Sequence, residues 1–171
     1  MARDVFKEQI VKKEPTLKSK LIKAGVILFI VVVFFFIFPY TGEFTVIITA
    51  ILGFAAYYFF GTLNVEYEYI FTNGELDIEC IYSKSRRKRL YSGVVRDFEI
   101  MTHVDDKNHA SAFNSAAETK DYSSGRTKDN TYAFLTAYKG KKLKIIIEPD
   151  DIMQQAFSTV ITPRKFIKKH P

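Results

Sequence analysis

Two apolar runs constrain this chain more than any other feature, because both are long enough to cross a lipid bilayer. The first covers residues 21–38 if Lys23 extends its ammonium group to the membrane surface, and the second covers residues 44–63. As helices they would be about 27 Å and about 30 Å long, close to the thickness of the hydrocarbon layer. Neither contains Asp, Glu or Arg, and only Pro39–Glu43 separates them. The sequence therefore predicts a transmembrane helical hairpin over residues 21–63.

Basic residues around the two runs predict their orientation. The reversal between the runs has no basic residue, whereas clusters of basic residues precede the first run and follow the second. The first cluster is Arg3, Lys7, Lys12, Lys13, Lys18, Lys20 and Lys23, and the second is Lys84, Arg86, Arg87, Lys88 and Arg89. Since Lys and Arg are enriched in cytoplasmic segments, we expect a two-pass protein of the cell membrane with both termini in the cytoplasm. A signal peptide is the alternative for the first run, but a second apolar run follows it instead of a small-residue cleavage site.

The excess positive charge is concentrated beside the membrane. The formal net charge is +6; residues 1–23 carry seven basic and three acidic side chains, whereas residues 64–171 carry 18 and 15. This distribution favours anionic lipid over nucleic acid as the charged partner. The one cysteine, Cys80, excludes an internal disulfide and fits a reducing cytosol.

Residues 1–20 form a basic N-terminal segment. Phe6 and Ile10 are four residues apart, so a helix over residues 2–14 would be amphipathic and could lie among the headgroups. A frayed basic tail is the alternative, because so short a helix is marginal in water. Thr16 is suited to cap the following helix.

The residue pattern over 64–162 predicts one mainly-β domain. Val65–Thr72 and Glu75–Tyr82 alternate between apolar and polar residues, and the Asn73-Gly74 pair between them favours a type I′ hairpin turn. A second hairpin is predicted around Lys139-Gly140, and short strands are predicted at 89–91 and 94–102 with a Ser92-Gly93 turn. Residues 103–130 lack alternation, so they either contain a weak strand around 110–116 or form a mobile functional loop.

A helix is predicted to follow the last strand, and a basic tail (residues 163–171) to follow the helix. Pro149 suits an early helical position, and Asp150 and Asp151 suit the positive end of the helix dipole. The apolar stripe of this helix would contain Ile152, Ala156, Phe157 and Val160.

Together these elements resemble the bacterial pleckstrin-homology-like (PH-like) membrane proteins of the YdbS/YdbT type. The likeness rests on the paired membrane helices, on the turn Phe71-Thr72-Asn73-Gly74, on the basic strand that leads into a hydrophobic one over 89–100, and on the final helix. The chain is also similar to small uncharacterised membrane proteins of Firmicutes, which imply no activity. The resemblance implies an antiparallel β-sandwich or barrel with one C-terminal helix.

The basic turn after the second strand is the candidate lipid site. Its cations could contact anionic headgroups: Lys84, Arg86, Arg87, Lys88 and Arg89. The alternative is that these residues only fix the membrane topology and otherwise lie in solvent.

The segment over residues 103–130 holds the other candidates. His103, Asp105, Asp106 and His109 are of metal-ligating types, but their spacing matches no known motif, so loop polarity is the simpler interpretation and no metal or cofactor is expected. His103, Phe113 and Tyr122 could instead contact a protein partner.

Catalytic interpretations are weaker. Alternation places Cys80 on the core face, and it places Glu66 and Glu68 on the solvent face, where paired carboxylates are common. We therefore expect a non-enzymatic module that docks a protein or anionic lipid. The alternatives are an accessory subunit of a larger membrane assembly and, third, a metal-dependent enzyme; small residues of the second run, such as Gly53, also permit an oligomer.

Overall fold

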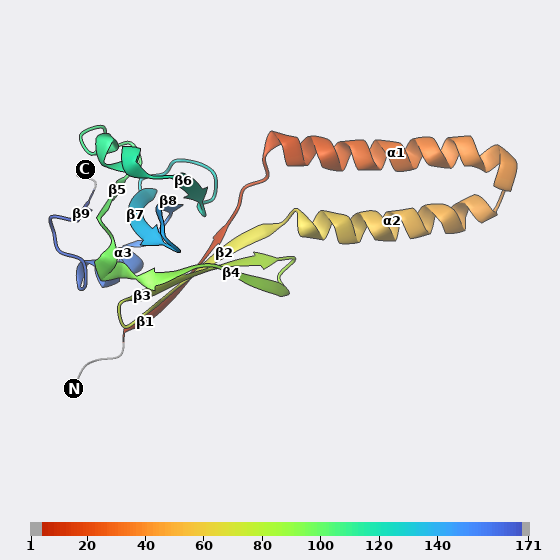
Figure 1. The fold of residues 1–171 in the computed structure, drawn as a ribbon. Helices are drawn as coiled ribbons and strands as arrows, with labels where there is room; N and C mark the ends of the chain where they lie inside the picture. Colours follow the sequence, from red (N-terminus) through yellow and green to blue (C-terminus); the bar gives the residue numbers. More distant parts are fainter. Residues whose placement is uncertain (1–4, 169–171) are drawn as a thin grey trace. The chain divides into compact units, whose positions relative to one another are not determined.

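The computed structural model describes residues 5–168 and divides the chain into two compact units (Figure 1). The helical unit comprises residues 15–65 and 82–86. The β unit comprises residues up to 14, residues 66–81 and the chain from residue 87 onwards. The helical unit is therefore inserted in the sequence of the β unit.

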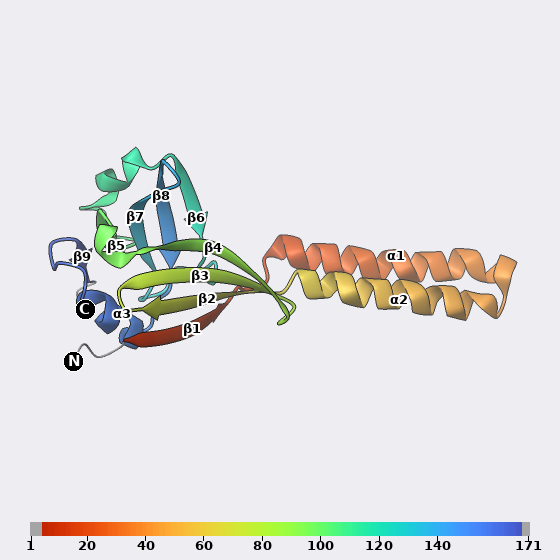
Figure 2. The same ribbon diagram turned by 60° about the horizontal axis from the view of Figure 1, so that its bottom comes forward.

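The helical unit contains the two predicted apolar helices, α1 (Leu17–Thr41) and α2 (Phe44–Thr62), which lie side by side (Figures 1 and 2). Both are long and apolar enough to cross a membrane. No residue of α1 is buried, and α2 buries only Thr45 and Ala56. Large apolar side chains such as Phe36 and Phe54 are more than 70% exposed, which in water would be strongly unfavourable. These helices indicate a membrane protein.

The ends of α1 differ from the predicted ones. Thr16 caps the helix, as predicted, by accepting a hydrogen bond from the Ser19 N–H (3.2 Å). The prediction that the reversal begins at Pro39 is wrong, because α1 continues to Thr41 and the Gly42 N–H donates to the carbonyl of Phe38 (2.9 Å). A proline is tolerated inside such a helix where neighbouring groups satisfy the freed backbone.

The segment before α1 is a strand, so the prediction of an amphipathic helix and its alternative of a frayed tail are both wrong for the described residues. β1 (Phe6–Lys12) pairs antiparallel with β2 (Val65–Thr72), and Val11 is buried. Residues 2–4 of the predicted helix lie outside the described part. The spacing of Phe6 and Ile10 also fits a period of two, and pairing with the edge of β2 decides between the two conformations.

The first sheet has the order β1-β2-β3-β4, with β3 (Glu75–Tyr82) and β4 (Arg86–Val94) (Figure 2). The predicted turn between β2 and β3 is confirmed: φ is 50° at Asn73 and 95° at Gly74. The predicted break at Ser92-Gly93 is wrong, because β4 continues through both residues. A short 3-10 helix, η1 (Val95–Asp97), follows it.

The second sheet has the order β6-β8-β7-β5-β9. Its strands are β5 (Ile100–His103), β6 (Glu118–Asp121), β7 (Tyr132–Tyr138), β8 (Lys141–Ile147) and β9 (Phe166–Ile167). The β6–β8 and β5–β9 pairs are parallel, and the pairs of β7 are antiparallel. Of the two alternatives for residues 103–130, a weak strand at 110–116 is wrong, because this stretch is the 3-10 helix η2 (Ala110–Ser115). Part of the predicted basic tail forms β9.

Helix α3 (Asp151–Ser158) closes the β unit. The Asp150 side chain caps it by accepting a hydrogen bond from the Met153 N–H (2.7 Å). Phe157 packs edge-to-face on Phe71 of β2 (5.5 Å between ring centroids), which turns Met153 inward as well. Ile152, which we predicted in the apolar stripe, is therefore 56% exposed. A helical hairpin combined with a mainly-β domain and a C-terminal helix is confirmed as the fold class.

Candidate functional site

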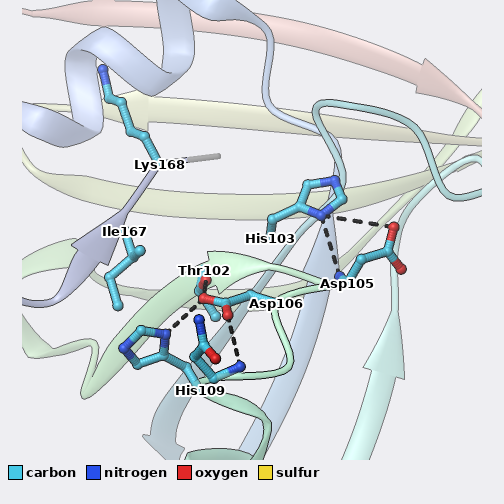
Figure 3. A pocket seen from close by; sticks show the side chains of 8 residues that line it. Thr102, His103, Asp105, Asp106, His109, Ile167 and Lys168 are labelled. Atoms are coloured by element: carbon cyan, nitrogen blue, oxygen red, sulfur yellow. Dashed lines mark hydrogen bonds and ion pairs between the residues drawn. The ribbon is translucent and has the colours of Figure 1, made fainter. Parts of the chain in front are cut away.

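A pocket of about 390 Å³ lies where β5 ends, beside β9 (Figure 3). Its lining includes all four residues of metal-ligating types from the sequence: His103, Asp105, Asp106 and His109. The other lining residues are Thr102, Asn108, Ile167 and Lys168. The loop that follows β5 turns back on the strand, since the Asp106 N–H donates to the His103 carbonyl (3.0 Å). The pairing of β9 with β5 brings Ile167 and Lys168 of the predicted tail to the same pocket.

Asp106 organises one side of the pocket. Its Oδ2 accepts hydrogen bonds from Thr102 Oγ1 (2.8 Å) and from His109 Nδ1 (2.7 Å), and its Oδ1 accepts one from the Asn108 N–H (2.9 Å). The bond from Thr102, with the one from His109, holds the pKa of the Asp106 carboxyl below its usual value. Asp106 is therefore a carboxylate that orients the His109 ring through its Nδ1. The Nε2 of the same ring is the nitrogen that can contact a ligand.

His103 is buried, and both of its ring nitrogens form hydrogen bonds within the protein. It is 4% exposed, its Nδ1 accepts a hydrogen bond from the Asp105 N–H (3.2 Å), and its Nε2 therefore carries the proton and donates to the Lys128 carbonyl (2.9 Å). The ring holds the two ends of the loop over residues 103–130 together.

The pocket does not fit a metal ion. Within residues 5–168, no group of three His, Cys, Asp or Glu side chains is arranged to hold one. Both nitrogens of His103 are used, and both oxygens of Asp106 accept hydrogen bonds. His109 and the exposed Asp105 can face a ligand in the pocket, whereas the Lys168 side chain points away from them (Figure 3).

Phe113 and Tyr122, which we predicted with His103 as a partner-binding set, lie elsewhere. Phe113 is in η2 with the Lys144 ammonium over its ring (4.9 Å), and Tyr122 packs against Tyr67 (5.5 Å). Neither lines the pocket that contains His103. A role for these residues in partner binding stays a prediction.

The basic residues of the candidate lipid site fall into two groups. The turn itself is only Ser83–Ser85, and the residues from Arg86 to Arg89 belong to β4. Arg87 forms an ion pair with Glu68 (2.6 Å), and Arg89 pairs with Glu79 (3.3 Å) and with Asp77 (3.6 Å). Among the described residues, Lys84, Arg86 and Lys88 form no ion pair and are exposed.

Glu68 is not on the solvent face that the alternation along β2 predicts. It is fully buried beneath Arg87. Burial raises the pKa of the Glu68 carboxyl, a hydrogen bond with the Glu8 side chain raises it further, and the charge of Arg87 opposes both. Cys80 is buried on the core face, as predicted.

The turn that carries Lys84 contacts the end of α2. The Ser83 N–H donates to the Asn64 carbonyl (3.3 Å), two residues after α2 ends. A methyl group added at Gly61 of α2 would lie 2.7 Å from Ser83 Oγ, so this glycine permits the close approach. Lys84 and Arg86 are thus held beside the last turn of an apolar helix.

The chain belongs to the bacterial PH-like domain family (DUF6106), whose family model matches residues 3–168. The match confirms the PH-like fold and covers the helices as well as both sheets. Domains of this kind are generally non-catalytic binding modules for lipids or proteins. No curated protein and no solved structure matches the chain.

Proposed function

We propose that the protein is a membrane-anchored, non-enzymatic binding module that contacts anionic lipid headgroups through Lys84, Arg86 and Lys88. The observation that carries this proposal is the contact between the β3–β4 turn and the end of α2 through Ser83 and Asn64. If α2 crosses the hydrocarbon layer, the residues beside its end are at headgroup depth.

The energetic argument favours the three unpaired cations over the two paired ones. A Lys or Arg near an anionic leaflet gains about 1 kcal/mol, and the gain falls off within a Debye length. Arg87 and Arg89 are already neutralised by carboxylates, so they add less to the attraction. They serve mainly to hold β4 in place.

The pairing of β1 with β2 supports the proposed topology. β1 leads into α1 and β2 leads out of α2, and the two strands are neighbours in one sheet. This pairing supports a topology in which both ends of the helical hairpin lie on the same side of the membrane. The basic residues there favour the cytoplasmic side, so we propose a two-pass protein of the cell membrane with cytoplasmic termini.

The test is lipid selectivity of the full chain in phosphatidylcholine bilayers that contain spin-labelled phosphatidylglycerol. The variant Lys84→Gln/Arg86→Gln/Lys88→Gln should lose at least about fivefold in relative affinity for the anionic lipid, which is the loss expected if only one of the three cations contributes its roughly 1 kcal/mol. The same change in charge on the β7–β8 hairpin, Lys139→Gln/Lys141→Gln/Lys142→Gln, is the control. Equal losses in the two variants, or no loss in the first, would contradict the proposal.

A further inference from the structure

The chain fills an edge of its own second sheet with its C-terminal segment. β9 lies parallel to β5, with Phe166 opposite Met101 and Ile167 opposite Thr102. The Met101 N–H donates to the carbonyl of Lys165 (2.6 Å). β9 contains two residues, so it covers only half of the four-residue strand β5.

One aromatic side chain anchors this segment. Phe166 is 5% exposed, and its ring packs edge-to-face on Tyr132 of β7 (5.7 Å). Lys165 adds a hydrogen bond from its ammonium to the Arg96 carbonyl (3.2 Å), and its backbone N–H closes a turn onto Thr162 (2.9 Å). A short strand with one buried anchor belongs to the part of a fold that opens most easily.

Two pockets border the segment. The pocket of about 390 Å³ described above reaches Ile167 and Lys168. A second pocket of about 340 Å³ borders the same segment and is lined by Ser158, Ile161, Pro163, Phe166, Ile167 and Lys168. Both pockets are lined by Ile167 and Lys168, and we call these pockets, together with the edge of β5 that the segment covers, the groove along β5.

We infer that the groove along β5 docks an extended peptide of a partner protein, and that residues 165–168 occupy it when the partner is absent. Strand addition to a sheet edge supplies backbone hydrogen bonds, and pockets for alternate side chains supply the specificity. The occupying residues, Lys-Phe-Ile-Lys, define the chemistry of the ligand: an aromatic anchor followed by an aliphatic residue, with a basic residue on each side.

One carboxylate of the groove is available to a cation of the ligand. The Asp105 side chain lines the pocket, is 69% exposed and forms no ion pair with a lysine or arginine among the described residues. The chain's own Lys168 does not take this position, because its ammonium lies over the Phe166 ring (5.7 Å) and its side chain points away from Asp105 (Figure 3). A basic residue of the ligand can therefore pair with Asp105. This inference is independent of the lipid contact, which involves other residues.

The test uses the full chain in mild detergent and a fluorescein-labelled peptide with the sequence of residues 162–168, TPRKFIK. Deleting residues 165–171 should raise the affinity for this peptide by about tenfold or more, because the competing segment is removed. A peptide with alanine in place of its phenylalanine should lose about tenfold or more. A scrambled peptide of equal charge should bind no better than the alanine peptide.

A second variant covers the case in which the shortened chain does not fold. Phe166→Ala in the full-length chain loosens the segment without removing it, and it should also increase peptide binding. The inference is wrong if folded variants bind the peptide no better than the parent, or if neither variant unfolds cooperatively, since the segment would then be part of the core. If the parent is a dimer that becomes a monomer on deletion, the groove binds a second copy of the chain. That result would contradict the inference that the groove docks a peptide of a partner protein.

Discussion

Residues 64–171 alone are expected to be less stable, by about 2.5–6 kcal/mol in the free energy of unfolding, than the same residues with residues 1–14 joined to residue 64 by a short Gly-Ser linker. The physical reason is β1. Burying Val11 contributes about 1.5–3 kcal/mol. The Gln9 side chain donates to the Glu148 carbonyl (2.8 Å) and accepts from the Asp150 N–H (2.8 Å), at about 0.5–1.5 kcal/mol for each bond.

Urea denaturation of the two soluble chains, followed by far-ultraviolet circular dichroism, measures this difference. The linked chain should unfold cooperatively, because β1 and β2 are adjacent antiparallel strands that a short connection can join. Equal stability of the two chains would show that β1 is not part of the domain. It would also remove the structural reason for placing both ends of the helical hairpin on one side of the membrane.

The second large effect is expected for Phe134→Ala, which should lower the free energy of unfolding by about 3–5 kcal/mol. Phe134 is fully buried in β7, and its ring stacks on Phe98 with 4.0 Å between ring centroids. Tyr91 packs on it edge-to-face at 5.6 Å. Removing the ring is expected to leave a cavity between β4, β7 and Phe98, which follows η1.

The matched control is Phe113→Ala, the same substitution at a half-buried position in η2. Its ring is contacted by the ammonium of Lys144 (4.9 Å), so the cost of the substitution should stay below about 1 kcal/mol. Both variants are compared in the linked soluble chain by denaturant titration. Similar losses at the two positions would mean that the core is not centred on Phe134.

Local patterns were sufficient wherever a short stretch of chain decides its own conformation. The two apolar runs, the Asn73-Gly74 and Lys139-Gly140 turns, and the cap of α1 at Thr16 are all features of this kind. Each depends on residues within a few positions of one another. Alternation similarly identified the core face of β3, which buries Cys80.

Elements formed by distant partners could not be predicted in this way. β1 pairs with a strand more than fifty residues later, and β9 pairs with one more than sixty residues earlier. Neither segment carries a strong strand pattern of its own. The burial of Glu68 depends on Arg87, which reaches it from β4, so alternation along β2 alone places Glu68 on the wrong side.

Fluorescence quenching tests directly whether the β3–β4 turn lies at the membrane surface. In a Cys80→Ala background, a bimane dye is attached to Ser85→Cys or, separately, to Asn64→Cys in the full chain in bilayers with nitroxide-labelled headgroups. The Ser83–Asn64 contact predicts that both dyes are quenched to a similar, high degree. A dye at position 85 that is quenched no more than free bimane in solution would contradict a position of the turn at the membrane surface.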